Sequence, residues 1–526
     1  MLALLACGFS GCGPASPPAS PEATERVNRD AELSVCFQNH NFNSFIPKEL
    51  HFYNEAQLLE LAFNTLVQAD HAGHLSPDLA TSWEVSKDRL DYTFHLRPNV
   101  RFSNGKRLTS RDVAFTLEEL ILRGSLDNEF YCITGAADFS SRKRHSISGL
   151  DIVHDYCLRI HLDRPFNLFL HLLASKAASV IPADYAGKSL REFRLDPIGT
   201  GPFKLNKKPE TVTIKHQNFH RIEFLRRNDY FAGPAPVKRI IVFLPLESPR
   251  ANTLYSFDIF LPPEGFGIDT IPTQSHKIIT SAPDTQVFLA INPSPANGEA
   301  LSENWRHILQ YGIDRERLIR ETGMERTSQA AHTIMPISLF GYNRYFRLDP
   351  ERAVEIRRRL PQGATATLPV TIYPRHVTLV SALNRQLAAF GLKLESVVLP
   401  LGPYYQGMRD QRRRAMIVRG ICDYPHAFNF LSQLYKSNGL LNYFNHSNPE
   451  IRELIGRLPL EDIRSQARLL EKIAGLCTED AWYIPLYFLS DQFILRKYVN
   501  HLSFKFGGII DFHAVEVNHE SINGSH

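Results

Sequence analysis

The sequence lacks the short motifs by which most enzyme classes are identified. It contains no G-x-S-x-G or cysteine-protease nucleophile motif, no phosphate-binding loop, no dinucleotide-binding glycine pattern and no H-E-x-x-H zinc motif. The adjacent carboxylates Glu118 and Glu119 fall in a helical pattern, and we expect both to be solvated. We therefore expect no enzyme activity, no catalytic residues, no bound metal and no cofactor.

A large excess of either charge is also lacking. Lysine and arginine together number 59 against 55 aspartate and glutamate residues, so the net charge is +4. A nucleic-acid-binding domain carries a concentrated positive surface instead. The basic runs are short and flanked by ordinary sequence, which is typical of a solvated surface; they lie at 142–144, 357–359 and 412–414. No nucleic-acid partner is expected.

Cysteine is scarce, and its spacing fits neither a zinc site nor a disulfide framework. Of the seven cysteines, two lie near the N-terminus, and the other five are widely separated without a C-x-x-C pair: Cys36, Cys132, Cys157, Cys422 and Cys477. We expect buried thiols among these five, although one disulfide stays open as an alternative. His71 and His74 form H-x-x-H in a polar turn, where we do not expect a metal.

The N-terminus has a pattern of its own. Residues 1–11 are apolar and small, Phe9-Ser10-Gly11-Cys12 approximates a bacterial lipobox, and a tract rich in Pro, Ala and Ser follows. The apolar segment is too short to span a bilayer, and no other stretch of the chain is predicted to span one. We predict a lipoprotein signal peptide at 1–12, lipidation of Cys12 and a flexible tether at 13–30. A disordered cytoplasmic tail is the alternative.

The length of 526 residues, 43% of them hydrophobic, predicts two or three domains. Local patterns indicate a mixed α/β chain: residues 33–37 and 91–96 read as strands, and 55–66 have apolar residues at helical spacing. The Asn-Gly pair at 104–105 predicts a hairpin turn, and Thr109 predicts the N-cap of a helix.

A series of blocks follows one order along the chain: 58–120, Asp196 to Leu205 with its Gly199-Thr200-Gly201 core, Asn228 to Pro234, Phe288 to Arg315, Tyr424 to Leu431, Asn448 to Glu450, and Ile484 to Tyr487. In this order and spacing, the chain resembles the extracellular solute-binding proteins of family 5, which include the dipeptide- and oligopeptide-binding proteins of ABC importers. The resemblance covers nearly all residues from about 33 to 510.

The resemblance implies an α/β, two-lobed periplasmic-binding-protein-like fold of type II, cluster C, with an extra domain inserted in lobe one. Lobe one is expected at 31–70, 190–272 and 484–526, the inserted domain at 71–189, and lobe two at 273–483. The chain would cross between the lobes twice, near 272 and near 483, and two short crossings suit a hinge.

The resemblance also implies where a peptide would bind. Asp423 is expected to receive the α-amino end of the ligand, with a backbone-capping turn aspartate as the alternative. Arg375 is expected to receive a carboxylate, with a surface role as the alternative. Arg419 stands beside the site where relatives often have Gly-Trp, and its charge would weaken the pull of Asp423 on an ammonium group. The remaining candidates are Cys422, Tyr424, Tyr404, Tyr405, Tyr131, Asn41, Phe42 and Asn43.

The expected function is capture of peptides in an interlobe cleft that closes on them, followed by delivery to a membrane permease and its ATPase. The protein would be a monomer, anchored by lipid in the periplasm or on the outer face of the cytoplasmic membrane. Another cargo stays open: a nickel chelate, haem, glutathione, a murein peptide or an oligosaccharide. So do two other classes, a ligand-sensing regulator and a secreted hydrolase.

Overall fold

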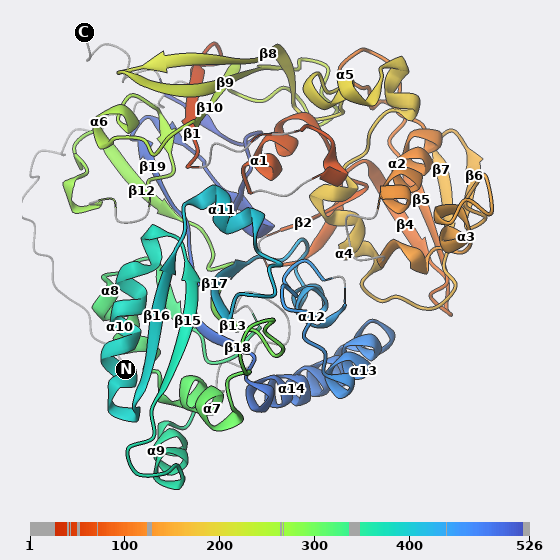
Figure 1. Cartoon of the computed structure of the whole chain (residues 1–526). Helices are drawn as coiled ribbons and strands as arrows, with labels where there is room; N and C mark the ends of the chain where they lie inside the picture. The colour runs from red at the N-terminus through yellow and green to blue at the C-terminus, as the bar shows by residue number, and fades with distance from the viewer. Residues whose placement is uncertain are drawn as a thin grey trace, which may run out of the picture.

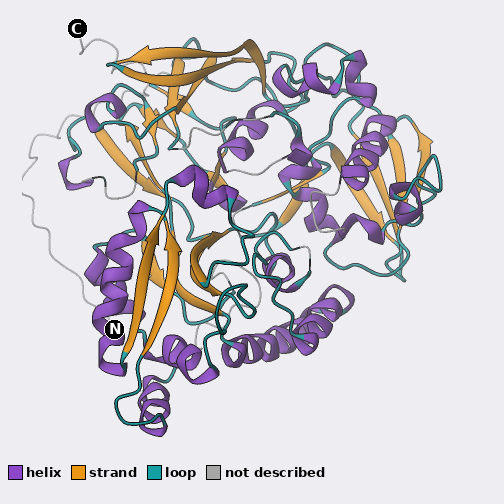
Figure 2. Cartoon of the chain, viewed as in Figure 1, coloured by secondary structure: helices purple, strands orange, loops and turns teal. Residues whose placement is uncertain are grey.

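The computed structural model describes residues 27–38, 42, 44–49, 53–70, 72–123, 129–263, 266, 268–335, 348–437 and 439–518. Helices and strands are interleaved throughout these residues, and they form two large mixed sheets and a smaller antiparallel sheet (Figures 1 and 2). The predicted α/β, two-lobed class is confirmed. Cys12, Asn41, Asn43 and His71 lie outside the described residues.

Lobe one is built on a seven-stranded sheet with the order β12-β19-β11-β1-β10-β9-β8. Its strands are β1 (Glu32–Cys36), β8 (Phe203–Ile214), β9 (Gln217–Arg226), β10 (Arg239–Pro245), β11 (Ile259–Phe260), β12 (His276–Thr280) and β19 (Gln492–Arg496). The associated helices are α1 (Tyr53–Ala62), α5 (Leu190–Leu195) and α6 (Ala251–Leu254). Short hairpins complete the lobe: β2 (Val67–Ala69) with β3 (Leu75–Pro77), β20 (Val499–Asn500) with β23 (Glu516–Val517), and β21 (Phe504–Lys505) with β22 (Ile509–Ile510).

Lobe two is built on a six-stranded sheet with the order β14-β18-β13-β17-β15-β16. Its strands are β13 (Thr285–Ile291), β14 (Ser328–Ala330), β15 (Ala366–Ile372), β16 (Leu392–Val398), β17 (Ala415–Gly420) and β18 (Tyr483–Leu489). Its helices are α7 (Glu303–Gly312), α8 (Arg315–Thr322), α9 (Pro350–Arg359), α10 (Val377–Leu387), α11 (Leu401–Gln406), α12 (Ala427–Tyr435), α13 (Pro449–Arg457) and α14 (Ile463–Asp480).

The central strand β13 shows why lobe two has helices on both faces. Successive side chains of a strand point to opposite faces. Val287 and Leu289 join one apolar cluster, with residues of α7, α8 and α10, whereas Phe288 and Ala290 join another, with residues of α12 and α13. Because both faces are covered, the strand reads as a continuous apolar run rather than an alternating one.

The inserted domain carries a four-stranded antiparallel sheet, β4-β5-β7-β6. Its strands are β4 (Ala80–Val85), β5 (Asp91–Leu96), β6 (Leu150–His154) and β7 (Cys157–His161), and its helices are α2 (Ser110–Arg123), α3 (Ala136–Ser140) and α4 (Phe169–Ala174). These elements lie within the predicted range of 71–189, and Figure 1 places them to one side of lobe one.

The strand pairing moves both interlobe crossings by several residues from the predicted positions. Strand β12 pairs with β19 in the first sheet, and β18 pairs with β13 in the second. The crossings therefore fall at 281–284 and 490–491, not at 272 and 483. The two crossing segments also bond each other, since the Ser281 amide donates to the Asp491 carbonyl at 2.9 Å and the Asp491 amide donates to Ser281 Oγ at 3.0 Å. The pattern of a strand gives no signal for which sheet it joins, so the sequence misplaced the boundaries.

Two glycines of the Gly199-Thr200-Gly201 block are needed for close approach. The amide of Gly201 donates to the carbonyl of Ala62, the last residue of α1, at 2.9 Å. A Cβ on Gly199 would lie 1.9 Å from the Ala62 carbonyl oxygen, and one on Gly201 would lie 2.4 Å from the Ala62 carbonyl carbon. Neither glycine has a positive φ, so it is the absence of a side chain that the fold uses.

One predicted surface carboxylate is buried. Glu119 contacts the ammonium of Lys48 and the hydroxyl of Tyr185. The prediction of a solvated Glu118–Glu119 pair was therefore wrong for Glu119, because α2 packs this position against the rest of lobe one. The expectation for cysteine is confirmed: each of the five cysteines in the described part of the chain is a buried free thiol.

Candidate functional site

Five strands of lobe two bring their ends to one edge of the sheet. β15 runs parallel to β16 and β17, so the carboxyl ends of these three strands lie together. β13 is antiparallel to β17, and β18 is antiparallel to β13, so the start of β13 and the end of β18 reach the same edge. Ligands of open α/β sheets bind outside the carboxyl ends of parallel strands. Both interlobe crossings also leave from this edge.

Arg375 lies directly beyond β15, in the short helix η6 (Pro374–His376). Its guanidinium lies over the ring of Tyr373, with 4.3 Å between the guanidinium carbon and the ring centroid. Burial lowers the pKa of Arg375. The neighbouring His376 is fully buried, and burial, together with the charge of Arg375, lowers its pKa to about 3. Its imidazole is therefore neutral, and the positive charge at this point belongs to Arg375.

Asp423 follows β17 and is partly exposed. Its Oδ2 accepts hydrogen bonds from Asn429 Nδ2 at 3.2 Å and from Gln433 Nε2 at 3.1 Å, and both donors come from α12. The Asp423 amide in turn donates to Asn429 Oδ1 at 2.9 Å. Two amides of α12 therefore orient this carboxylate at the sheet edge.

Arg419 adds a second guanidinium at this edge. It interacts with the carboxylate of Asp491, a residue that sequence reasoning missed. Arg419 and Tyr487 both pair with Val287 of β13, one on each side, so their side chains share a face of the sheet. Burial lowers the pKa of Arg419. Burial raises the pKa of Asp491, while the charges of Arg419 and Arg375 act in the opposite direction. Asp491 therefore belongs to the same electrostatic cluster as the two arginines.

Asp284 is the second carboxylate that sequence reasoning missed. It is buried directly before β13, and its charge raises the pKa values of Asp491 and of the Cys422 thiol. Asp284 and Asp491 each lie next to the end of a buried strand at an interlobe crossing. Their position next to strand ends at the crossings is the one signal in the sequence that could have identified these two residues. Using it would have required placing the interlobe crossings correctly.

The other predicted residues of lobe two divide between the sheet edge and the core. Tyr405 on α11 is the exposed member of a tyrosine pair, whereas Tyr404 is buried and its hydroxyl donates to the carbonyl of Ile417. Cys422 is buried, and burial raises its pKa. Tyr404 and Cys422 are therefore packing residues, whereas Tyr405 lies at the surface.

Tyr424 connects this edge to the inserted domain. It is fully buried, and its hydroxyl donates to Glu129 Oε2 at 2.6 Å. The ammonium of Lys436 lies 3.6 Å from the other oxygen of Glu129. Glu129 belongs to the short helix η2 (Glu129–Cys132) of the inserted domain, so two side chains of lobe two meet one carboxylate across the interface. Sequence reasoning missed both Glu129 and Lys436.

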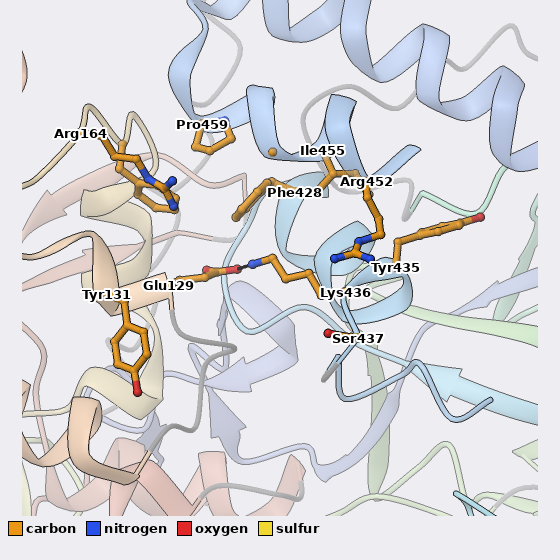
Figure 3. Close-up of a pocket in the computed structure, with 12 residues that line it drawn as sticks. Glu129, Tyr131, Arg164, Phe428, Tyr435, Lys436, Ser437, Arg452, Ile455 and Pro459 are labelled. Atoms are coloured by element: carbon orange, nitrogen blue, oxygen red, sulfur yellow. Dashed lines mark ion pairs between the residues drawn. The ribbon is translucent and has the colours of Figure 1, made fainter. Parts of the chain in front are cut away.

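A pocket of about 450 Å³ lies at this interface. The inserted domain contributes Glu129, Tyr131, Arg164 and Phe166, and lobe two contributes residues of α12 and α13 with their flanking loops (Figure 3). Tyr131, a predicted ligand contact, lines this pocket, and its hydroxyl shares a 2.6 Å hydrogen bond with Ser140 Oγ. Arg375, Arg419 and Asp423 are not among the residues that line this pocket.

Phe42 is the only predicted residue of the lobe-one loop that the structure describes. It is half-buried, and its ring packs edge-on against Phe45 with centroids 4.7 Å apart. This contact is one of packing in lobe one.

Within the described ranges, no three His, Cys, Asp or Glu side chains are grouped so as to hold a metal ion. His74, from the H-x-x-H pair, lies 3.1 Å from Asp70 on an exposed turn. The same ranges contain no helix that is long and apolar enough to cross a membrane.

Comparison with known families assigns the fold. The model of the bacterial extracellular solute-binding proteins, family 5, matches residues 74–442, which is well over half of the chain. The chain belongs to this family. The match includes the strands of the inserted domain, the ends of β13, β15, β16 and β17 at the lobe-two sheet edge, and the Asp423 loop.

Individual relatives are distant, but the matches cover most of each chain. The chain is 24% identical over 519 residues to haem-binding protein A of Haemophilus influenzae, covering 92% of this chain and 91% of that protein. It is 25% identical over 408 residues to di/tripeptide-binding protein 1 of Pseudomonas aeruginosa, covering 72% and 73%. The periplasmic binding protein DppA of Helicobacter pylori, solved with the peptide STSA, superposes with a TM-score of 0.74 at 20% identity, covering 93% of this chain and 98% of that one.

Proposed function

We propose that this family 5 solute-binding protein captures short peptides between its lobes and delivers them to an ABC importer. The proposal is supported by the positions of Asp423 and Arg375 in the chain, just beyond the ends of the adjacent parallel strands β17 and β15 at one edge of the lobe-two sheet. A peptide is a zwitterion, and burying either of its charged ends without a partner is costly. This edge offers one group of each sign.

In this proposal Asp423 receives the α-amino group, because its carboxylate is partly exposed and is oriented at the sheet edge by Asn429 and Gln433. Arg375 receives the carboxylate, because a guanidinium fork suits that group and its stacking on Tyr373 restricts its motion. Arg419 and Asp491 set the local balance of charge, because Arg419 opposes the effect of burial on the pKa of Asp491. Tyr405, exposed on α11, is the aromatic side chain that we assign to the ligand side chains.

Capture proceeds by closure of the cleft. A ligand that contacts both lobes favours the closed state over the open one, and the two short crossings at 281–284 and 490–491 absorb the movement. The closed protein, a monomer, then meets a membrane permease whose ATPase supplies the energy for transport. The protein performs no chemistry on its cargo.

We place the mature protein on the outer face of the cytoplasmic membrane, attached through a lipid on Cys12. The lipobox-like Phe9-Ser10-Gly11-Cys12 sequence and the Pro-, Ala- and Ser-rich residues after it support this placement. A tether of this composition gives a globular body the reach to meet a permease.

Haem is the second candidate cargo, because haem-binding protein A matches 92% of the chain. Native mass spectrometry of protein purified without denaturation tests the two candidates directly. Co-purified peptide masses, released on denaturation, are the expected result. A haem mass and a Soret absorption band without peptide masses would replace the proposal with haem binding.

A further inference from the structure

The pocket between the inserted domain and lobe two is lined by more cationic than anionic side chains. Among the residues of the described ranges, three cationic side chains line it, Arg164, Lys436 and Arg452, and one carboxylate, that of Glu129. That carboxylate is already engaged by Lys436 and by the Tyr424 hydroxyl. The pocket therefore keeps a positive field, and a cleft with low-dielectric walls focuses such a field.

Most N–H donors of the Arg164 and Arg452 guanidinium groups make no hydrogen bond in the described part of the chain. Arg164 is exposed, and within the described part of the chain its guanidinium makes no hydrogen bond or ion pair. Arg452 makes one hydrogen bond there, to Ser447 Oγ at 3.3 Å, and no ion pair. A guanidinium has five N–H donors in a fixed fork. Each arginine can therefore receive a carboxylate from solvent without breaking an ion pair of the fold.

Figure 3 shows how these groups are arranged. Arg164 lies on the side of the inserted domain and Arg452 on the side of lobe two, with the Glu129–Lys436 pair between them. Apolar surface lies along the same space, because the rings of Phe166 and Phe428 pack with centroids 5.8 Å apart and both line the pocket. A ligand that reaches both arginines needs an anionic group at each end and an apolar middle.

We propose that this pocket is a second binding site, in addition to the sheet edge at Asp423 and Arg375, for small organic dicarboxylates. Its volume of about 450 Å³ lies within the range of small-molecule pockets. One carboxylate binds Arg164, the other binds Arg452, and the apolar middle lies against Phe428. Because the two arginines belong to opposite sides of the interface, the bound dicarboxylate also holds the inserted domain against lobe two.

Isothermal titration with isophthalate and with its neutral analogue isophthalamide tests the site, because the two probes share shape and differ in charge. Isophthalate should bind and isophthalamide should not. Arg164→Gln and Arg452→Gln should each weaken isophthalate about tenfold, which is typical of losing a hydrogen bond to a charged group. Both arginines are exposed, so neither variant is expected to unfold the protein.

Arg358→Gln is the matched control, since Arg358 is an exposed arginine of α9 far from the pocket in sequence and outside its lining. This variant should bind isophthalate as the wild type does. The proposal is overturned by any of three results: no heat of binding at millimolar isophthalate, equal binding of the diamide, or equal affinity of the Arg164, Arg452 and Arg358 variants.

Discussion

The Tyr424 hydroxyl donates a 2.6 Å hydrogen bond to Glu129 Oε2, between two buried residues that lie 295 positions apart. Tyr424 directly follows Asp423, the residue to which we assign the ligand amino group. Glu129 belongs to the inserted domain. The bond therefore ties the ligand-binding loop of lobe two to the domain on the other side of the interface, and Lys436 reinforces it from 3.6 Å.

Glu129→Gln should loosen this connection while keeping the shape of the side chain. The amide still accepts a hydrogen bond from Tyr424, but the charge that attracts Lys436 is gone. Hydrogen bonds to charged groups contribute about 1.5–3 kcal/mol, so we expect cargo to bind about tenfold more weakly, mainly through faster dissociation. Stopped-flow measurement of ligand release checks this.

Glu453→Gln supplies the control for that measurement, because it removes one carboxylate from the exposed face of α13. Its dissociation rate should match that of the wild type. If Glu129→Gln also matched the wild type, the Tyr424–Glu129 contact would have no part in retaining the ligand.

The assignment of the two ligand ends predicts a crossed pattern of losses. Asp423→Asn should weaken alanyl-alanine about thirtyfold, the typical loss of one hydrogen-bonded charge partner, and leave N-acetylated dipeptide binding unchanged. Arg375→Gln should weaken alanyl-alanine similarly and leave the C-terminal amide unchanged. Calorimetry with the two capped peptides gives the comparison. Equal losses for capped and uncapped peptides would show that the two side chains only support the fold.

Local patterns predicted a mixed α/β chain, because strands and turns are set by nearby residues. The two-lobed fold and the Asp423 loop were predicted from the resemblance to the family. Strand β5 lies at Asp91–Leu96, as its alternation indicates. By contrast, Glu129 and Asp491 could not be predicted. Each acquires its role from contacts with segments far away in the sequence, and neither stands in a motif. The burial of Glu119 escaped prediction for the same reason, since its partner Lys48 comes from a separate element.

Gly201→Ala should destabilise the protein, although it adds only a methyl group. The new Cβ would lie 2.4 Å from the carbonyl carbon of Ala62, and backbone cannot move aside as a flexible side chain can. Overpacking of this kind costs about 1–3 kcal/mol, and we expect the upper end. Urea unfolding of Gly201→Ala beside Gly475→Ala tests it, since Gly475 on α14 has open space and a helical backbone. Gly475→Ala should stabilise by about 0.5–1 kcal/mol, and equal effects for the two variants would contradict the packing argument.

Cys12→Ser should release the protein from the membrane. A thioether-linked lipid requires the cysteine thiol, so the variant is expected in the soluble fraction of cells while the wild type sediments with membranes. Cys7→Ser is the internal control, because Cys7 lies outside the lipobox-like sequence and its loss should leave sedimentation unchanged. Membrane sedimentation of Cys12→Ser would place the anchor elsewhere.

His376 should make the fold sensitive to acid. Burial, followed by the charge of Arg375, lowers the pKa of its imidazole from 6.5 to about 3, so the folded state resists a proton that the unfolded chain accepts. The stability it contributes is fully present above the unfolded pKa of about 6.5 and is lost as pH falls toward 3, at about 1.4 kcal/mol per pH unit. Neither ring nitrogen of His376 has a hydrogen-bond partner in the described structure, and the ring packs 4.3 Å from that of Tyr373.

A phenyl ring can therefore replace this imidazole. His376→Phe should match the wild type at pH 7 and exceed its unfolding free energy by about 2.5–3 kcal/mol at pH 4.5, as measured by urea unfolding at both pH values. His426, whose pKa burial lowers to about 4, keeps part of the acid sensitivity in the variant. His145→Phe, at an exposed position, should lose stability on acidification as the wild type does. If His376→Phe lost as much stability as His145→Phe between the two pH values, the proton would enter the folded state at His376 freely.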